Sequence, residues 1–344
     1  MTESTKFPRF AFVTGATGLL GNNLVRALVT KGVIVRALVR SASKAEKQFS
    51  GLKIELVEGD INETESFASQ LAGVDTVFHT AAYFRDNYKG GKHWPELFTT
   101  NVVATAKLLR TSYQAGVRRL IHTSSTATLR GQPGKAANET MLRDERDADD
   151  YQRSKILADR EVLKFLEGQP DFWAAFVLPG WIHGPGDLGP TAAGQTVLDY
   201  LNRRLPGIPP GGFSVVDARD VAEASVRVAQ HGTRGERYIV AGKSVTMAEL
   251  FRALETVSGI PSPRSKVPIS LLYLIAAFSE FQVRVTRKPG LISWATARLI
   301  ARDGDRNSYD HSKSQRELGI RFRDIHETLR DEIEWFKQKG LAAG

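Results

Sequence analysis

The sequence contains no cysteine among its 344 residues. Disulfide bonds and thiolate chemistry are therefore excluded, and the cysteine usage gives no sign of an oxidising compartment. Residues 1–8 are polar and contain no apolar core of the kind found in signal peptides. We therefore expect a cytoplasmic location.

The sequence also has no long hydrophobic run. Its most apolar stretch, residues 267–283, is interrupted by Ser270, Ser279, Glu280 and Gln282. A membrane-spanning helix needs about 20 mainly apolar residues, so this stretch is too short and its end too polar. A buried helix or an apolar lid over a pocket is the favoured interpretation, and contact with a membrane surface is the minor one.

Two further kinds of site are missing from the sequence. The formal net charge is +9, but the basic residues are scattered and show no basic-aromatic stripe, so we expect no nucleic-acid partner. His79, His122 and His183 are far apart and have no metal-ligand spacing. No metal site is predicted, and packing at strand ends is the favoured role of His79 and His122.

The first half of the chain alternates apolar strands with helical patterns. This alternation predicts a parallel sheet covered by helices on both faces, with right-handed crossovers, which is a doubly wound α/β fold. The predicted strands are residues 10–13, 33–39, 54–58, 76–80, 120–124 and 173–178. The predicted helices between them are residues 22–30, 63–71, 94–115 and 151–166.

Three glycines spaced by three residues follow the first strand directly. Gly15, Gly18 and Gly21 stand between residues 10–13 and a helical pattern that carries Leu20 and Leu24 on one face. A glycine turn between strand and helix lets the backbone approach a phosphate, which then faces the positive end of the helix. An ordinary strand-to-helix turn is the alternative, but the position in the first βαβ unit favours a dinucleotide site.

These features predict a Rossmann-type dinucleotide-binding domain over residues 8–180. After Pro179 the sequence is rich in glycine and proline, and two short segments within about 214–241, residues 214–216 and 237–240, are expected to return to the sheet. Residues 181–213 and 242–338 are expected to form a smaller, mostly helical substrate-binding lobe.

The end of the second predicted strand favours NADP over NAD. NAD sites usually place an acidic residue about 20 positions beyond the glycines, where it binds the ribose hydroxyls. Here Arg40 stands there, followed by Lys44. A guanidinium can bind a 2′-phosphate that a carboxylate would repel, although a solvated strand end is the alternative. Asp60, which ends the third strand, can bind the adenine amino group and can also cap the next helix.

Tyr151 and Lys155 open a predicted helix and lie one turn apart on one face. A nearby cation stabilises a phenolate, so such a tyrosine can act as general acid toward a carbonyl or as base toward an alcohol. Two other pairs, Tyr88/Lys92 and Tyr309/Lys313, have the same spacing. Only Tyr151 and Lys155 follow a strand that ends in a run of hydroxyls, residues 123–126, at the edge where parallel sheets bind ligands.

The ordered set of motifs resembles the extended short-chain dehydrogenase/reductases, the NAD-dependent epimerase/dehydratase superfamily. The motifs TGATGLLG, EGDI, VFHTAA, VRRLIHTSS, YQRSK and LPGWIHGPGD follow one another over about residues 10–240. Within that family, VRALVR and VRRLIHTSS are most similar to the dihydroflavonol reductase and 3β-hydroxysteroid dehydrogenase branch. Many such relatives are dimers and some are monomers, so a homodimer is one expectation.

The resemblance implies a role for each matching residue. It implies Ser125 as the catalytic hydroxyl, with Thr126 as second choice, Tyr151 as the acid/base and Lys155 as the group that holds the nicotinamide ribose. It implies contacts with the pyrophosphate by Gly15, Thr17, Gly18, Leu19 and Leu20; with the 2′-phosphate by Arg40 and Lys44; with adenine by Asp60 and Ile61; with the body of the cofactor by Ala81 and Ala82; and with the nicotinamide by Pro179 and Ile182. Asn101 either supports the adjacent backbone or caps the helix that begins at Val102.

Bulky residues expected on loops at the same edge favour a hydrophobic carbonyl substrate. They are Tyr83, Phe84, Trp94, Trp181, His183 and Phe213. The leading hypothesis is an NADP(H)-dependent oxidoreductase that reduces a ketone or aldehyde of a hydrophobic small molecule. An epimerase of sugar nucleotides with tightly bound NAD is the alternative, which Arg40 disfavours. A non-catalytic NADP-sensing protein is a third hypothesis, which the Tyr/Lys pair disfavours.

Overall fold

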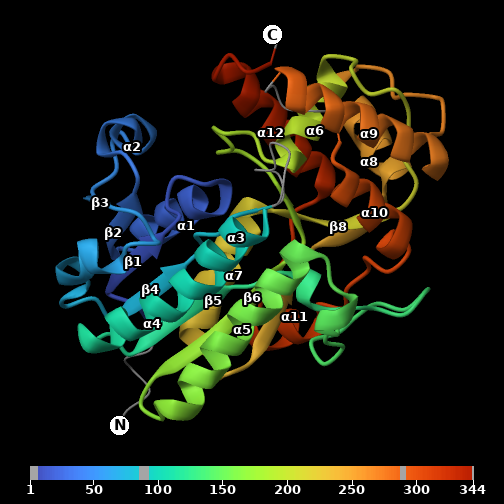
Figure 1. Ribbon diagram of the computed structural model, residues 1–344. Helices are drawn as coiled ribbons and strands as arrows, with labels where there is room; N and C mark the ends of the chain where they lie inside the picture. The colour runs from blue at the N-terminus through green and yellow to red at the C-terminus, as the bar shows by residue number, and fades with distance from the viewer. Residues whose placement is uncertain (1–6, 85–92, 287–291, 343–344) are drawn as a thin grey trace.

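The computed structural model describes residues 7–84, 93–286 and 292–342 (Figure 1). Its centre is a sheet of seven strands, all parallel, in the order β3-β2-β1-β4-β5-β6-β9. This confirms the predicted Rossmann-type sheet. The strands are β1 (Phe10–Thr14), β2 (Ile34–Val39), β3 (Glu55–Glu58), β4 (Thr76–His79), β5 (Arg119–Thr123), β6 (Trp173–Pro179) and β9 (Arg237–Val240).

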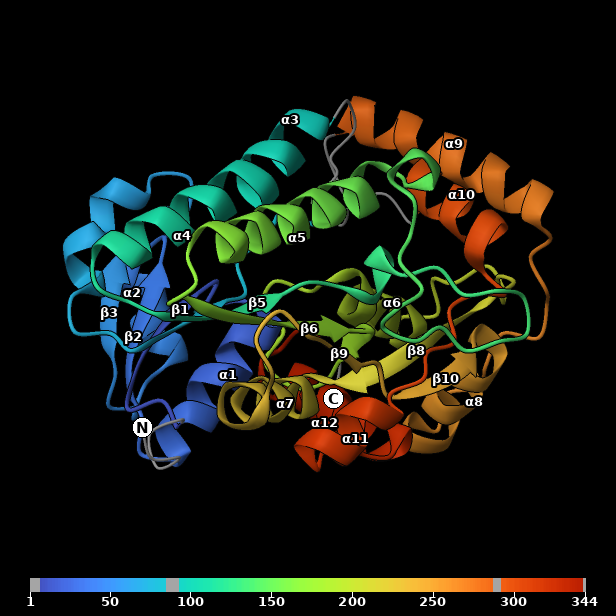
Figure 2. The ribbon, with the colours of Figure 1, turned by 90° about the horizontal axis from the view of Figure 1, so that it is seen from below.

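Helices cover both faces of this sheet (Figure 2). On one face lie α1 (Leu19–Thr30) and α7 (Ala218–His231), and on the other α4 (Ala104–Gln114) and α5 (Asp150–Gly168). Successive strand residues point to opposite faces, so Ala11 and Val13 enter one apolar core and Phe12 the other. Burial on both faces explains why these strands are continuous apolar runs rather than alternating ones.

The strand order reverses at β1, since β2 lies on one side of it and β4 on the other. In open parallel sheets, ligands bind outside the carboxyl ends of the strands at such a reversal. The glycine turn that follows β1 therefore stands at the expected ligand crevice.

The remaining connections in the first half of the chain are also helical. The predicted helix over residues 94–115 is one continuous helix in three parts, because a π-helical turn interrupts its regular hydrogen bonding. Its parts are α3 (Trp94–Leu97), the π turn (Phe98–Val103) and α4. The shorter connections are α2 (Ala42–Gln48) and 3₁₀ helices at Thr64–Leu71, Thr126–Thr128 and Glu145–Asp147.

A second, three-stranded sheet corrects one expectation. The segment 214–216 does not return to the main sheet, because β9 occupies the edge beside β6. It instead belongs to β8 (Gly212–Asp217), which pairs with β7 (Trp181–His183) and β10 (Lys243–Thr246). Val215 then packs with the apolar side chains of the C-terminal helices.

The C-terminal part is mostly helical. Its helices are α6 (Ala192–Leu201), α8 (Met247–Ser258), α9 (Ile269–Thr286), α10 (Trp294–Asp303), α11 (Ser312–Leu318) and α12 (Ile325–Gln338). α9 packs on α10 through Leu272 and Ala276, but its opposite face is exposed, so the first of the two favoured interpretations of residues 267–283, a buried helix, holds for one face only. Among the described residues, no helix is long and apolar enough to cross a membrane.

Candidate active site

Two of the three glycines after β1, Gly15 and Gly21, have no room for a side chain. Gly15 has a φ of +66°, and a Cβ on it would lie 2.7 Å from the amide nitrogen of Ala81. A Cβ on Gly21 would lie 2.1 Å from the carbonyl oxygen of Gly15. Both positions thus require glycine, one for the close approach of β1 to the loop after β4 and one for the packing of α1 under the turn.

The amino end of α1 can bind an anion. Its N-cap residue is Gly18, which has no side chain to occupy the first N–H groups of the helix, those of Leu19 and Leu20 among them. No acidic residue lies in the first turn. Together with the positive end of the helix dipole, these N–H groups fit a pyrophosphate. The residues present at this turn are therefore suited to a dinucleotide cofactor. Thr17 lies half-buried beside them in the same turn.

The predicted 2′-phosphate site holds one residue that the sequence analysis missed. Arg40 and Lys44 are exposed at the end of β2 and on α2, and neither takes part in an ion pair within the described residues. Glu58, at the end of β3, accepts a hydrogen bond from the amide of Ala42 at 2.9 Å. The parallel register that sets Val39 beside Glu58 brings this carboxylate to the start of α2. The position of Glu58 in this site follows from the pairing of β2 with β3 and not from any local motif.

Asp60 forms a tight turn at the end of β3. Its Oδ1 accepts hydrogen bonds from the amide nitrogen of Asn62 at 2.8 Å and from Asn62 Nδ2 at 3.0 Å. The following 3₁₀ helix begins only at Thr64, so Asp60 does not cap it as expected. The neighbouring Ile61 is buried.

His79 joins the two strands that flank the crevice. Its Nδ1 lies 2.8 Å from Thr14 Oγ1, and its Nε2 lies 2.9 Å from Thr105 Oγ1. Thr14 Oγ1 in turn accepts a hydrogen bond from the amide of Ala81 at 3.2 Å. Burial lowers the pKa of His79 well below its usual value, so the ring is neutral. These contacts hold the loop of Ala81 and Ala82 against the glycine turn.

Asn101, in the π turn, supports the backbone and does not cap a helix. Its Oδ1 accepts from the amide of Tyr83 at 2.7 Å, and its Nδ2 donates to the carbonyl of Tyr83 at 2.9 Å. Nδ2 also donates to Ser154 Oγ at 3.0 Å. Asn101 therefore ties the loop after β4 to α5 at a residue between Tyr151 and Lys155.

The Tyr/Lys pair lies on α5, whose start is fixed by a capping box of Asp149 and Gln152. The Nζ of Lys155 donates to the carbonyl oxygen of Thr123 at 2.8 Å, which places the helix against the carboxyl end of β5. Burial lowers the pKa of Lys155 to about 8, while the charge of Asp159 acts in the opposite direction. Tyr151 is 7% exposed, and the ring of Phe84 meets its ring edge-on at 4.6 Å.

The three hydroxyls after β5 have different partners. Ser124 Oγ is buried and donates to Asp159 Oδ2 at 2.9 Å, away from the crevice. Thr126 Oγ1 is buried and donates to the carbonyl of Pro179 at 3.1 Å. Ser125 is half-buried, and its Oγ accepts from the amide of Ala127 at 3.1 Å. The described residues offer no acceptor for the proton of Ser125, which leaves that proton for a ligand.

The remaining residues expected at the nicotinamide and the substrate divide into two groups. Pro179 ends β6, and the half-buried Ile182 follows in β7. The ring of Trp181 packs on that of Phe213, with centroids 4.9 Å apart. His183, by contrast, is fully buried with its Nδ1 3.0 Å from Glu332 Oε2, so it does not line a pocket. The sequence predicted His183 among the pocket residues, and the structure corrects that expectation.

The other tyrosine–lysine pairs do not form a second site. Lys313 Nζ donates to Glu236 Oε2 at 2.6 Å and to the carbonyl of Arg237 at 2.9 Å. Its ammonium therefore binds the start of β9 and does not form a site with Tyr309. Tyr88 and Lys92 lie outside the described residues. Across the described ranges, no cluster of three or more His, Asp or Glu residues could hold a metal ion.

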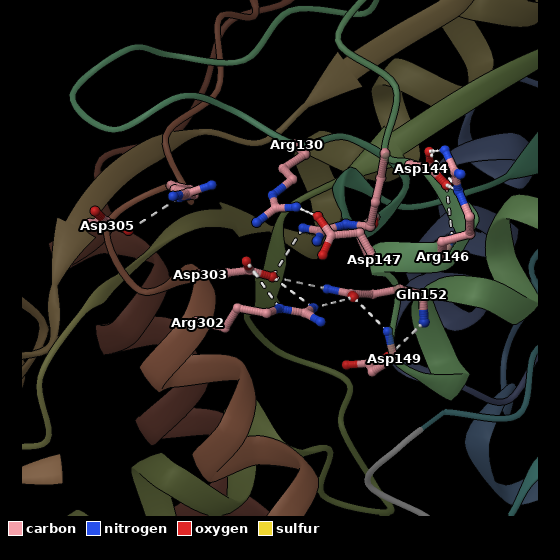
Figure 3. A network of polar contacts seen from close by, with 12 residues as sticks. Arg130, Asp144, Arg146, Asp147, Asp149, Gln152, Arg302, Asp303 and Asp305 are labelled. Carbon is pink, nitrogen blue, oxygen red and sulfur yellow. Dashed lines mark hydrogen bonds and ion pairs between the residues drawn. The ribbon is translucent and has the colours of Figure 1, made fainter.

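A buried polar network joins the start of α5 to the end of α10 (Figure 3). Gln152 Nε2 donates to Asp303 Oδ2 at 3.3 Å, and Arg302 Nη2 donates to Gln152 Oε1 at 2.7 Å. Arg143 Nη2 lies 3.1 Å from Asp303 Oδ2, and both side chains are buried. Burial acts to raise the pKa of Asp303, but its hydrogen bond with Arg302 and the charges of Arg143 and Arg302 outweigh that effect and lower it.

Taken together, these residues form one arrangement at the carboxyl edge of the sheet. An anion site of backbone N–H groups lies after β1, and a hydroxyl and a tyrosine–lysine pair lie after β5 and on α5. Such a set can hold a dinucleotide and can move a proton to or from an oxygen atom. It defines a Rossmann-fold enzyme of the nicotinamide-dependent kind.

Residues 11–241 match the NAD dependent epimerase/dehydratase family, and the chain belongs to this family of extended short-chain dehydrogenase/reductases. Sterol demethylase protein B of Methylococcus capsulatus is 35% identical over 334 residues, which cover 96% of this chain and 98% of that protein. A putative dihydroflavonol 4-reductase of Synechocystis is 32% identical over 96% of this chain and 95% of that protein. The crystal structure of gox2253 matches with a TM-score of 0.82 and 30% identity over 97% of this chain and 100% of that chain.

Proposed function

We propose that this protein is an NADP(H)-dependent oxidoreductase that reduces the ketone or aldehyde group of a hydrophobic small molecule. The observation that carries the proposal is the hydrogen bond from Lys155 Nζ to the carbonyl of Thr123 at 2.8 Å. It holds the helix that bears Tyr151 against the strand end that bears Ser125, beside the glycine turn. A proton donor, a cation and a dinucleotide site therefore share one edge of the sheet.

The chain's own residues supply the proton chemistry. The cofactor, when bound, supplies the hydride that the carbonyl carbon accepts. The hydroxyl of Tyr151 donates its proton to the carbonyl oxygen, so that the carbonyl becomes an alcohol and Tyr151 becomes a phenolate. The ammonium of Lys155 stabilises that phenolate. The proton of Ser125 forms a hydrogen bond with the same oxygen as negative charge develops on it.

Ser125 is preferred to Thr126 for this role because of their hydrogen bonds. The proton of Thr126 is already given to the carbonyl of Pro179 in a buried contact. Ser125 is half-buried and only accepts a bond, from the amide of Ala127. A hydroxyl that keeps its proton can donate to a substrate oxygen at no cost to the fold.

Arg40 and Lys44 support NADP as the cofactor. Both are exposed cations at the place where the 2′-phosphate of NADP lies in dinucleotide folds. Glu58 acts in the opposite direction, since its carboxylate reaches the start of α2. The guanidinium of Arg40 can form a bidentate pair with a phosphate, which outweighs the screened repulsion from one exposed carboxylate.

The surroundings of Tyr151 support a hydrophobic substrate. Phe84 contacts its ring, and Trp181 and Phe213 pack together on the second sheet. Residues 179–214, where a sugar nucleotide's second diphosphate would need cations, contain only Arg203 and Arg204. The names of these two relatives, a sterol demethylase protein and a putative dihydroflavonol reductase, refer to ring compounds and not to sugar nucleotides.

The test is a cofactor assay on the purified protein. Any co-purified nucleotide is identified by absorbance and mass, and the affinities for NADPH and NADH are then compared. We expect an empty site as purified, tight binding of NADPH and weak binding of NADH. NAD retained through purification would overturn the proposal and put the epimerase alternative first.

Matched variants locate the source of the preference. Arg40→Ala should weaken NADPH binding by about 10- to 100-fold while NADH binding changes little, because a charge-assisted bidentate contact is lost. Glu58→Gln should strengthen NADPH binding. Lys53→Ala, which removes an exposed cation near β3, controls for net charge and should have no effect. Reductase activity on hydrophobic ketones and aldehydes is then screened with NADPH.

A further inference from the structure

One face of α9 is apolar and exposed along its whole length. The side chains of Leu271, Leu274, Phe278, Phe281 and Val285 follow one another three or four residues apart, the spacing that puts them in one row. Their exposed fractions are 44%, 68%, 69%, 65% and 67%. Single exposed apolar residues are ordinary, but a continuous row of five marks a surface that contacts something. We call this row the α9 stripe.

The opposite face of α9 is fully used by the fold. Leu272, Ala276, Ser279 and Val283 are buried, and the first two pack with Ala297 and Ile300 of α10. The α9 stripe is therefore not needed to attach the helix to the protein. Figures 1 and 2 place α9 at the outer edge of the molecule.

The charges in the segment that contains α9 are mostly positive. Arg264 and Lys266, just before α9, and Arg298 on α10 are exposed, and none forms an ion pair within the described residues. In residues 261–301 the sequence has six Lys or Arg residues and a single acidic one, Glu280. Glu280 accepts a hydrogen bond from the amide of Trp294 at 2.9 Å, at the start of α10.

An amphipathic aromatic side chain of α10 lies against α9. Trp294 is 41% exposed, and its ring packs on Tyr273 of α9 with centroids 4.9 Å apart. Tryptophan prefers the boundary between the head groups and the acyl chains of a bilayer. Leucine and phenylalanine on one face, with tryptophan and cations beside them, is the composition of helices that lie in that boundary.

We propose that the α9 stripe binds the surface of an anionic phospholipid bilayer, with α9 lying in the plane of the membrane. Leu274, Phe278 and Phe281 enter the acyl region, while Arg264, Lys266 and Arg298 pair with anionic head groups. The proposal concerns attachment only and does not depend on the reaction or on the cofactor.

A second copy of the chain is a less suitable occupant. A symmetric dimer through the α9 stripe would bring two identical sets of cations together, and residues 261–301 of each copy supply a single acidic side chain, Glu280, to offset them. Like charges at close range oppose such a contact. An anionic lipid surface supplies both the apolar phase and the negative charge.

The experiment is vesicle co-sedimentation of the full chain. Vesicles of phosphatidylglycerol and phosphatidylcholine are compared with vesicles of phosphatidylcholine alone. The variant is Leu274→Asp with Phe278→Asp, and the control is Ile34→Asp, which changes an exposed apolar residue at the start of β2. We expect binding to the anionic vesicles, at least about tenfold weaker in the double variant and unchanged in the control, because two large apolar side chains leave the lipid. No binding by the wild-type protein, or equal loss in the control, would overturn the proposal.

A charge variant tests the second half of the proposal. Arg264→Glu with Lys266→Glu should weaken binding to anionic vesicles by about tenfold or more, since each cation near such a surface adds to the attraction and each carboxylate opposes it. Added salt should weaken wild-type binding in the same way. Binding that is unchanged by lipid charge and by salt would contradict the proposed pairing of these cations with anionic head groups.

Lipid-specific quenching locates the contact, and it does not depend on activity. Brominated acyl chains should quench the fluorescence of Trp294 on binding, and Trp294→Phe should remove most of the quenching. Sedimentation velocity distinguishes the other occupant. A wild-type dimer that the stripe variant converts to a monomer, without any binding to vesicles, would assign the α9 stripe to a second copy and overturn the proposal.

Discussion

Gln152 and Asp303 are 151 residues apart in the sequence, yet Gln152 Nε2 donates a hydrogen bond to Asp303 Oδ2 at 3.3 Å. Gln152 immediately follows Tyr151 in the first turn of α5, and Asp303 is the last residue of α10 (Figure 3). The contact therefore links the C-terminal helices to the residue beside the proposed proton donor. Because Asp303 is fully buried and also pairs with Arg143, the link is part of the interior rather than a surface ion pair.

Replacing Asp303 should destabilise the protein and disturb the start of α5. Asp303→Asn leaves the buried guanidinium of Arg143 without its counter-charge, which typically costs about 3–5 kcal/mol. We expect a lower free energy of unfolding by denaturant and, in the folded fraction, a lower kcat with a smaller change in KM for NADPH. Gln152 would still cap α5 with Asp149, so binding at the distant glycine turn should persist.

Asp305→Asn is the matched control for that change. Asp305 lies two residues further on, is well exposed and pairs with Arg306 across 3.7 Å. Surface pairs of this kind contribute at most about 1 kcal/mol. Equal effects of the two substitutions on unfolding and on kcat would contradict the link through Asp303.

Tyr151→Phe should remove the proton donor and leave the cofactor site intact. Losing a general acid lowers kcat by about 10²- to 10⁴-fold, because no group then donates a proton to the carbonyl oxygen as negative charge develops on it. The aromatic ring that meets Phe84 remains, so the free energy of unfolding should change little. Titration of NADPH binding by fluorescence checks the site, and a variant with wild-type kcat would remove Tyr151 from the mechanism.

Lys155→Met should stabilise the fold while abolishing activity. Burial lowers the pKa of Lys155 to about 8, which means that the folded protein holds the ammonium less well than water does. Removing a charge that is disfavoured in this way should raise the free energy of unfolding at pH 7 by about 1–3 kcal/mol, part of the gain being offset by the lost bond to Thr123. Denaturant unfolding and turnover measure the two effects.

The stability gain from Lys155→Met should depend on pH. Between the pKa of Lys155 in the fold, about 8, and its higher value in the unfolded chain, unfolding takes up a proton. Raising the pH through this interval therefore stabilises the wild-type protein relative to the variant. The gain should be largest below pH 8 and shrink toward pH 10, and a gain that stays constant across this range would count against a buried ammonium.

Gly15→Ala should destroy the cofactor site. The new Cβ would lie 2.7 Å from the amide nitrogen of Ala81 at a residue whose φ is +66°, so the turn or the loop must move. We expect NADPH binding to weaken by at least about tenfold, since backbone approach to the phosphates depends on this glycine. Gly32→Ala is the control, because φ there is +78° but a Cβ would meet nothing within 4 Å. It should cost only about 1–2 kcal/mol of stability and no affinity.

The local patterns of the sequence predicted most of the sheet. The apolar runs and the glycine turn marked β1 to β6 to within a few residues, since strands buried on both faces need continuous apolar sequence. The segment 214–216 was assigned to the wrong sheet. Its apolar character was clear, but whether it pairs with β6 or with β7 depends on which other strand, here β9, takes the edge.

Long-range contacts in the site could not be predicted in this way. Glu58 reaches the start of α2 through the register between β2 and β3, and Asp303 reaches Gln152 through the packing of α10. Nothing in the neighbouring sequence of either residue indicates its partner. His183 looked like a pocket residue because of its loop position, yet β7 directs it toward Glu332 in the interior.

By itself, the sequence determined the class of fold, the position of the glycine turn after β1 and the placing of Tyr151 and Lys155 one turn apart on one helix, because strand burial, glycine geometry and helical spacing act over a few residues. The tertiary structure alone decided which hydroxyl keeps its proton, where Glu58 and Asp303 act, and that the α9 stripe is exposed. These features depend on which elements pack together in the folded chain. Burial, hydrogen-bond partners and exposure are set by contacts between residues far apart in the sequence and not by any short segment.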